Sequence, residues 1–421
     1  MPKLNRRQFL TSTTASGLAL CSGLVPWRAM ASSTSHLNVV FVFNGGGWDP
    51  TRVLANCFDQ RAVAMEHDAG ITSYGNLSFV DHEDRPSVRS FFEQYHESCM
   101  ILNGLLVPSV AHANCARLMM TGTTNDGASD WAAIMAGMNG EGLALPQLVL
   151  SGPSYPGVHG TSVTRTGSSG ELQSLLNGEV IEWSDLSARK PHERAEDYMD
   201  TYLLRRSAAA IAGAKMPRAK ELYQAYDASL ERAVNLKDLQ SIVDWDAAGD
   251  LTELGKLTAD LLQLGICRCI MMNHGGSGWD SHTNNDATQS QSWESLFSGL
   301  LDMTSRFAAL PGKVAPTLLD ETLIVVLSEM GRTPALNDGD GKDHWPYTSA
   351  MIMGPGITGD RLVGATDEFY YGKTIDPDSG ELYAGGVDLT VSSFGATLLN
   401  LVGIDHEPYL AGVPSLPGLL T

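Results

Sequence analysis

The chain has 421 residues, enough for one large α/β domain or for about two or three domains of average size. It carries 28 Lys and Arg against 48 Asp and Glu, a formal net charge of −20, which argues against nucleic acid and anionic membranes as partners. Hydrophobic residues make up 43% and charged residues only 18%, which excludes a disordered or fibrous chain and is typical of a globular protein.

The first 31 residues have the pattern of a twin-arginine export signal. Arg6 and Arg7 precede a weakly apolar run over 15–27, which ends at small residues over 29–31. The alternative, a membrane anchor, needs about 20 apolar residues, and this run is shorter and interrupted by Ser22 and Pro26. We therefore expect the export machinery to recognise residues 1–31, and the mature protein to be periplasmic or secreted without stable membrane insertion. Because the signal holds four basic residues and no acidic ones, the mature chain has 24 basic residues against 48 acidic residues, a net charge of −24.

After the signal, short apolar runs alternate with longer helical patterns, which is typical of a mostly parallel sheet wrapped by helices. Residues about 190–262 differ because they are mostly helical and of mixed charge, and we interpret them as a helical insert. The sequence therefore predicts one α/β domain over 32–421 that contains this insert. The clearest predicted strands are 37–43, 100–102, 147–150, 266–272, 322–327 and 350–353.

The mature chain contains five cysteines and no CxxC spacing. An odd number permits at most two disulfides and leaves one thiol over. Cys267 and Cys269 would lie on the same face of one strand, where a bridge between them would be strained. We expect buried structural cysteines. The five are Cys57, Cys99, Cys115, Cys267 and Cys269.

Acidic and imidazole side chains stand in the glycine-bearing loops that follow several predicted strands. In open α/β sheets ligands bind where strands end at their carboxyl edge, so we expect these loops to converge on one site. Asp280 and His282 alternate on an extended segment, which lets both grip one ion. Each residue alone also fits an ordinary turn or a surface histidine, and the local pattern leaves both interpretations open. The candidate metal ligands are Asp49, Asp280, His282, Glu329, Asp343 and His344.

Several of these segments resemble the alkaline phosphatase and sulfatase superfamily. Residues 322–331, TLIVVLSEMG, are similar to its strand and Ser-Asp-His-Gly loop, in which the Asp-His pair binds a metal. His344 with the strand and turn over 350–357 resembles the last histidine ligand and the strand that follows it, and residues 391–404 resemble the closing helix. More narrowly, the ordered set resembles an exported bacterial family of unknown function in that superfamily. Its elements are the twin-arginine signal, GGWD (46–49), GWDSH (278–282), SEMGRTP (328–334) and GKDH (341–344).

The resemblance implies a three-layer α/β/α fold, alkaline phosphatase-like, with the helical insert added. It also implies one complete metal site, formed by Asp280, His282 and His344. A weakened second site would contain Asp49 and Glu329, because Met330 stands where the superfamily has a histidine. The mixed carboxylate and imidazole set favours Zn²⁺ or Mn²⁺, with Ca²⁺ or Mg²⁺ as alternatives.

The position of the sulfatase nucleophile holds His112. In sulfatases a Cys or Ser begins a helix that ends in Leu-Thr-Gly, and residues 118–122, LMMTG, resemble that end. A histidine can act as a nucleophile, a metal-bound hydroxide can attack without one, and His112 can instead be a further metal ligand or a polar helix-start group. We expect Arg332 to hold an anionic ester because guanidinium groups match phosphate and sulfate oxygens, with Arg117 fitting either this role or a helix ion pair.

These observations predict an exported metal-dependent hydrolase whose substrate is a phosphate or sulfate ester, either an anionic small molecule or a glycan ester. His112 and Arg332 are its predicted catalytic residues. The altered nucleophile and the missing histidine favour an alternative of another class: an exported binding or assembly protein that keeps the fold and one metal but has no turnover. A third interpretation is that the acidic loops bind Ca²⁺ for a purely structural purpose.

Overall fold

The computed structural model describes residues 36–140, 142–167, 172, 193–237, 249–275 and 278–420. The predicted export signal over 1–31 lies outside the described residues. So do residues 238–248 of the predicted insert and residues 276–277 of the loop that precedes Asp280. Among the described helices, none has the combination of length and apolarity that crossing a bilayer requires.

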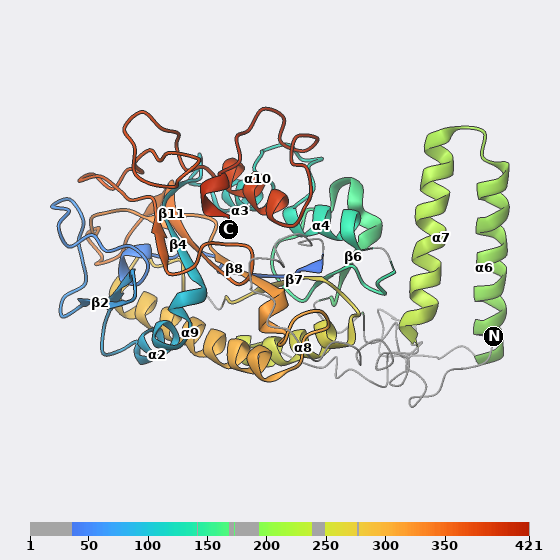
Figure 1. Cartoon of the computed structure of the whole chain (residues 1–421), viewed down its shortest axis with the longest axis horizontal. Helices are drawn as coiled ribbons and strands as arrows, with labels where there is room; N and C mark the ends of the chain where they lie inside the picture. Colours follow the sequence, from blue (N-terminus) through green and yellow to red (C-terminus); the bar gives the residue numbers. More distant parts are fainter. Residues whose placement is uncertain are drawn as a thin grey trace, which may run out of the picture. The chain divides into compact units, whose positions relative to one another are not determined.

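An eight-stranded sheet forms the middle layer of the fold (Figure 1). Its first strand in the chain, β1 (Asn38–Phe43), is completely buried because its sequence, NVVFVF, is almost continuously apolar. It pairs in parallel with β7 (Cys269–Asn273) on one side and with β8 (Thr322–Leu327) on the other. Most neighbouring strands are parallel, as predicted, and only β11 (Tyr347–Met353) runs antiparallel, to β8 and to β4 (Cys99–Leu106). The order is β12-β4-β11-β8-β1-β7-β5-β6, with β5 (Gln147–Val149), β6 (Val163–Arg165) and β12 (Arg361–Val363).

Helices cover both faces of the sheet. Val40 and Val42 belong to a core shared with α2 (Pro86–Tyr95), α8 (Leu251–Leu264) and α9 (Asn285–Ala309). Val39 and Phe41 belong to the core on the other face, with α3 (His112–Thr121), α4 (Trp131–Asn139) and α10 (Val391–Leu401). Alternate residues of one strand therefore serve two cores, and the three-layer α/β/α prediction is confirmed.

The predicted helical insert over about 190–262 contains two different parts. The helices α6 (Glu193–Gly213) and α7 (Pro217–Lys237) pack side by side and run in opposite directions (Figure 1). The helix α8, by contrast, buries Leu254, Leu257 and Leu261 in the core of the sheet. This corrects the predicted C-terminal boundary of the insert: α8 is part of the α/β domain, because its apolar residues recur at a spacing of three and four.

The remaining described elements are short. Two hairpin-like pairs stand outside the main sheet, β2 (Gly70–Tyr74) with β3 (Leu77–Asp81), and β9 (Gly331–Arg332) with β10 (His344–Trp345). All five cysteines of the predicted mature chain are free and buried. Short 3₁₀ helices occur at η3 (Pro50–Arg52), η4 (His96–Ser98), η5 (Gly157–Ser162), η6 (Leu319–Glu321) and η7 (Pro417–Leu419).

Asp130 caps the N-terminus of α4 and makes the stability of the fold depend on pH. Its buried carboxylate accepts hydrogen bonds from the backbone N–H groups of Ala133 (2.7 Å) and Tyr155 (2.6 Å). Burial raises the pKa of Asp130 to about 6. This value exceeds the pKa of an aspartic acid in the unfolded chain, so protonation of Asp130 favours the folded state. Its contribution to the free energy of unfolding is complete below about pH 4 and is lost as the pH rises through about 6.

We expect Asp130→Asn to remove this pH dependence, because the amide does not titrate. Between pH 4.5 and pH 7, the free energy of unfolding should fall by about 2 kcal/mol more in the wild type than in the variant. Urea unfolding at the two pH values measures the difference. Asp250→Asn, at the exposed N-cap of α8, is the matched control. Parallel pH profiles of wild type and Asp130→Asn would contradict the assignment.

Candidate metal centre

Four side chains meet beyond the strand ends at one edge of the sheet. His112 is the first residue of α3 and follows β4, while Asp280 and His282 lie in the segment after β7. His344 lies on β10, directly opposite Arg332 of β9. The loops therefore converge, as expected from the position of ligands in parallel sheets.

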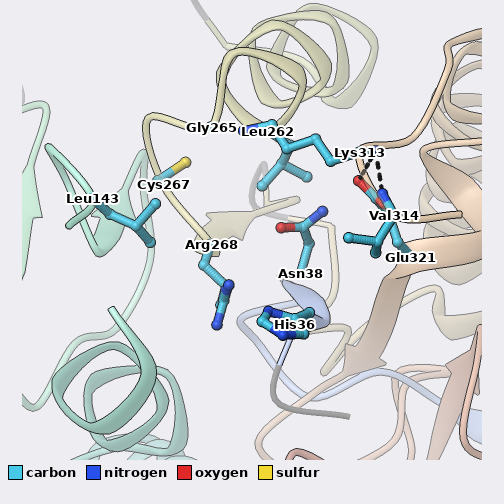
Figure 2. Close-up of a pocket in the computed structure, with 10 residues that line it drawn as sticks. All are labelled: His36, Asn38, Leu143, Leu262, Gly265, Cys267, Arg268, Lys313, Val314 and Glu321. Carbon is cyan, nitrogen blue, oxygen red and sulfur yellow. Dashed lines mark hydrogen bonds between the residues drawn. The ribbon is translucent and has the colours of Figure 1, made fainter. Parts of the chain in front are cut away.

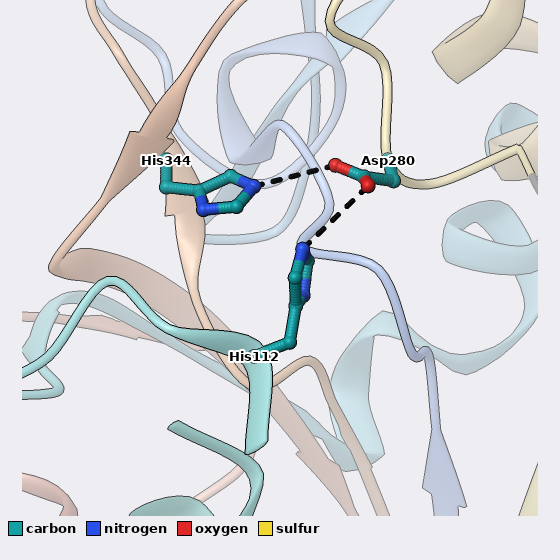
Figure 3. Close-up of side chains that lie close together, drawn as sticks. All are labelled: His112, Asp280 and His344. Carbon is teal, nitrogen blue, oxygen red and sulfur yellow. Dashed lines mark hydrogen bonds and ion pairs between the residues drawn. The ribbon is translucent and has the colours of Figure 1, made fainter. Parts of the chain in front are cut away.

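The imidazole Nε2 atoms of three histidines point toward the carboxylate of Asp280. His282 Nε2 lies 3.0 Å from His344 Nε2 and 3.2 Å from Asp280 Oδ1. His344 Nε2 is 3.4 Å from the same oxygen, and His112 Nε2 is 3.6 Å from Asp280 Oδ2. Figure 3 shows His112 and His344 approaching Asp280 from two sides. Asp280, His282 and His344 thus form a tight triad, and His112 stands beside it.

The other ring nitrogen of each histidine contacts an oxygen. His112 Nδ1 lies 2.8 Å from Glu329 Oε1, His282 Nδ1 lies 2.9 Å from Asp343 Oδ1, and His344 Nδ1 lies 2.8 Å from the carbonyl oxygen of Val110. Because carboxylates and carbonyls only accept, each Nδ1 carries a hydrogen and donates it. In the neutral imidazoles this leaves the Nε2 lone pairs directed at the centre, the arrangement found in metal-binding histidines.

The residues fit a divalent metal ion. In the neutral rings the Nε2 lone pairs of His282 and His344 repel each other at 3.0 Å, which a proton or a metal ion between them relieves, and the buried Nε2 of His112 has no hydrogen-bond partner among the described residues. Donors 3.0 to 3.4 Å apart are spaced like neighbouring ligands of an ion whose bonds are about 2 Å long. Three imidazoles and one carboxylate are a donor set typical of Zn²⁺.

Neighbouring charges and hydrogen bonds lower the pKa of two carboxylates at the centre, Asp280 and Asp343, and raise the pKa of His112. Burial opposes ionisation of Asp280, but the hydrogen bond (2.6 Å) and charge of Arg332, together with His112 and His344, outweigh it and lower the pKa of that carboxyl. The hydrogen bond to Glu329 raises the pKa of His112, against the effect of burial. The bond to His282 lowers the pKa of Asp343.

Asp49 does not reach this centre, which corrects its prediction as a ligand. Its completely buried carboxylate accepts hydrogen bonds from Thr51 Oγ1 (2.6 Å), Asn285 Nδ2 (2.9 Å) and Lys342 Nζ (2.9 Å). Burial opposes its ionisation, yet Lys342 and Arg52 hold the pKa of Asp49 well below its usual range. Asp49 is therefore the anion of an internal ion network. The side-chain partners of Asp49 and Glu329 among the described residues are different, so these two residues do not form the predicted second metal site.

Glu329 and Asp343 contact the histidines from outside, so their predicted role as direct ligands is also corrected. Glu329 is almost completely buried, and its oxygens accept from Gly46 N (2.8 Å) and Ser328 Oγ (3.0 Å) in addition to His112. Asp343 remains exposed and accepts from His282. Both carboxylates orient a histidine, a role that supports metal binding indirectly.

Arg332 is completely buried, which corrects its prediction as the group that holds an anionic ester. Its guanidinium donates to Asp280 Oδ1 and to four carbonyl oxygens, those of Gly46, Gly47 (2.7 Å), Trp279 (3.1 Å) and Lys342 (3.1 Å). Nε, Nη1 and Nη2 each donate to these oxygens, and the side chain has no exposed surface, so Arg332 does not face a substrate that approaches from solvent. Arg332 instead positions Asp280 and joins the loops around it. Arg117, the other candidate, pairs with Asp126 and lies over the ring of Tyr155.

Sequence reasoning missed the contacts that bring the loops together. Gly341 is an example, because a Cβ at this position would overlap the carbonyl oxygen of His282. Only glycine therefore allows the segment with Asp343 and His344 to approach the segment with His282. The glycine-rich turn was visible in the sequence, but its partner, 59 residues away, was not.

A separate hollow lies at the opposite edge of the sheet, near the first residue of β1 and just before β7 (Figure 2). His36, Arg268 and Lys313 line it together with Glu321. The Glu321 carboxylate accepts from the backbone N–H groups of Lys313 and Val314, which indicates a structural role. No residue of the histidine centre contributes to this hollow.

The model of the family described as "Protein of unknown function (DUF1501)" matches residues 93–418. No curated protein matches the chain. Similar solved structures include the lipoteichoic acid synthase LtaP from Listeria monocytogenes (TM-score 0.38, 9% identity), covering 97% of this chain and 80% of that one. A protein in the alkaline phosphatase superfamily from Vibrio parahaemolyticus has a TM-score of 0.35 and 9% identity, covering 96% and 76%. The PsFucS1 sulfatase from Pseudoalteromonas sp. has a TM-score of 0.36 and 10% identity, covering 100% and 77%.

Proposed function

The chain belongs to the DUF1501 family of proteins of unknown function, and we propose that it is an exported, metal-dependent hydrolase of a phosphate or sulfate ester. One observation carries this proposal. Three imidazole Nε2 atoms converge on the Asp280 carboxylate, and each histidine is fixed from outside by a carboxylate or a carbonyl. The proposal of export rests on the sequence pattern around Arg6 and Arg7.

Asp280, His282 and His344 would hold the ion. When bound there, a divalent ion would polarise an ester oxygen and offset the negative charge of a phosphate or sulfate group. A local positive charge is needed because the net charge of the whole chain, −20, does not attract anions. Since the side chains of Asp280 and His282 are each 45% exposed, a substrate can approach from solvent.

His112 is placed to move a proton. Its Nδ1 is held by Glu329, so in the neutral ring Nε2 is free to accept a proton from attacking water. The raised pKa of His112 strengthens it as a base, and the protonated ring can then donate from Nε2 to the leaving oxygen. Glu329 keeps the ring in the required orientation throughout.

The experiment that tests the proposal is metal analysis of the protein recovered from the periplasm, followed by a panel of phosphomonoester, phosphodiester and sulfate-ester substrates. We expect about one ion per chain and turnover that disappears with a chelator and returns with the metal. Absence of bound metal under varied metal supply would contradict the proposal. Recovery of the intact protein from the cytoplasm alone would contradict export.

A second candidate function is an exported binding or assembly protein that keeps the metal but has no turnover. The observation that favours it is the presence of four donors at the centre. If His112 also binds the ion, four protein ligands would close a tetrahedral site, which is typical of structural zinc. Stoichiometric metal without turnover on any ester of the panel would favour this second function.

We expect His112→Ala to separate the two functions. If His112 moves protons, kcat should fall by about 10²- to 10⁴-fold while the metal content stays near that of the wild type. If His112 is a ligand, the metal affinity should fall instead. Glu329→Gln disturbs the orientation of the His112 ring. It should therefore lower kcat by about 10- to 100-fold if His112 moves protons, or the metal affinity by the same factor if His112 is a ligand. His67→Ala, at an exposed histidine outside the centre, is the control. Activity and metal content unchanged in His112→Ala would remove His112 from both roles.

A further inference from the structure

The helices α6 and α7 form a hairpin whose outward surface is unusually rich in large apolar side chains. Of the 18 exposed large hydrophobic residues in the described part of the chain, seven lie within residues 193–237, with exposed fractions from 42% to 77%. A surface helix normally turns polar residues to solvent. Tyrosine and methionine, by contrast, are enriched at the centres of protein interfaces. The seven residues are Tyr198, Met199, Tyr202, Met216, Leu222, Tyr223 and Tyr226.

The charge of the hairpin differs sharply from that of the rest of the molecule. Residues 193–237 contain eight basic and seven acidic residues, a net charge of +1. The rest of the predicted mature chain contains 16 basic and 41 acidic residues, a net charge of −25. Two copies of this protein repel each other over most of their surface. A second copy therefore meets less repulsion at the hairpin than over the rest of the chain taken as a whole.

The two ends of the hairpin carry opposite charge. The turn end, residues 203–224, contains Arg205, Arg206, Lys215, Arg218 and Lys220 and a single acid, Glu221. The other end contains the first half of α6, residues 193–202, with four acidic residues and one basic residue. Glu196 and Asp200 of that half also have a partner within the chain. Two hairpins packed in antiparallel fashion place the basic end of each on the acidic end of the other, which fixes orientation.

We propose that the α6–α7 hairpin is a self-association surface that packs against the same hairpin of a second copy and forms an antiparallel four-helix bundle. Such an isologous contact buries the same patch on both subunits. The exposed tyrosines, methionines and leucine supply its apolar area, and the separated charges supply its register. The proposal does not depend on the metal centre or on the proposed hydrolase activity.

Sedimentation velocity of the full mature chain at about 1 to 100 μM in buffered salt tests the proposal. We expect a concentration-dependent dimer in the wild type. Tyr198→Glu combined with Tyr202→Glu should weaken it by at least about tenfold. The matched control is Phe369→Glu combined with Tyr383→Glu, which changes two exposed aromatic residues outside the hairpin and should leave dimerisation intact. Circular dichroism checks that each variant is folded.

Charge reversal tests the orientation. Arg205→Glu with Arg206→Glu should weaken the homodimer, and mixing this variant with Asp197→Lys should restore association as a heterodimer. A wild type that stays monomeric over the whole concentration range overturns the proposal. So does a dimer that the hairpin variants leave unchanged, because the contact must then lie elsewhere on the chain.

Discussion

Asp280→Asn should lose the bound metal, with an affinity at least about 100-fold below that of the wild type. The Asp280 carboxylate is the one group of the centre within 3.6 Å of all three histidine Nε2 atoms, and Arg332 keeps it ionised. An asparagine has no negative charge to offset the positive charge of a cation, and its NH₂ group replaces one of the two carboxylate oxygens. Isothermal titration with Zn²⁺ and Mn²⁺ measures the affinity, and metal analysis of the purified variant measures retention. Ester hydrolysis should disappear together with the metal.

Asp302→Asn is the matched control for this variant. The Asp302 side chain is 44% exposed, against 45% for Asp280, and it also faces an arginine, Arg306, at 3.9 Å. It lies on α9, outside the centre. We expect no change in metal affinity. If Asp280→Asn bound metal as tightly as this control, the assignment of the centre would be wrong.

Arg332→Met should lower the free energy of unfolding by about 3–5 kcal/mol. The side chain is completely buried, and its removal leaves carbonyl oxygens from three loops without their donor. It also removes the hydrogen bond that directs Asp280, so metal affinity should fall in a variant that still folds. Chemical unfolding without metal measures the first effect, and metal titration measures the second.

Two further variants make this result specific. Arg332→Lys keeps the charge but cannot reach all the carbonyl oxygens, so its stability should lie between those of Arg332→Met and the wild type. Arg306→Met removes a half-exposed arginine whose ion pair spans 3.9 Å, and should cost at most about 1 kcal/mol. Equal losses in Arg332→Met and Arg306→Met would contradict the structural role of Arg332.

The central strands were predictable because their sequences are continuously apolar. The run over 322–327 corresponds to β8 residue by residue, and 37–43 differs from β1 only at its first residue. The limit of the helical insert was missed although the sequence carries a signal for it. Apolar residues of α8 recur at a spacing of three and four and are buried in the sheet core, Leu257 among them, whereas α6 and α7 expose large apolar side chains such as Tyr198.

The candidate site could be predicted in part. Asp280, His282 and His344 come together, as alternation and strand-end position indicated. The roles of Asp49 and Arg332 were not predictable, because a carboxylate or a guanidinium is equally suited to a ligand and to an internal ion pair. What decides between them is the approach of Lys342 to Asp49 and of Asp280 to Arg332, contacts that span tens to hundreds of residues.

The contacts of Arg332 bear on whether the loops around the centre become ordered during folding or only when an ion binds. Its guanidinium joins the loop after β1, the segment that holds Asp280 and the turn that leads to His344. We therefore expect these loops to be ordered by folding itself rather than by an ion. The loss of conformational entropy would then occur during folding, and an ion bound at the proposed centre would require little further rearrangement of the backbone. In this respect the protein would differ from zinc fingers, which acquire their structure only when the metal binds.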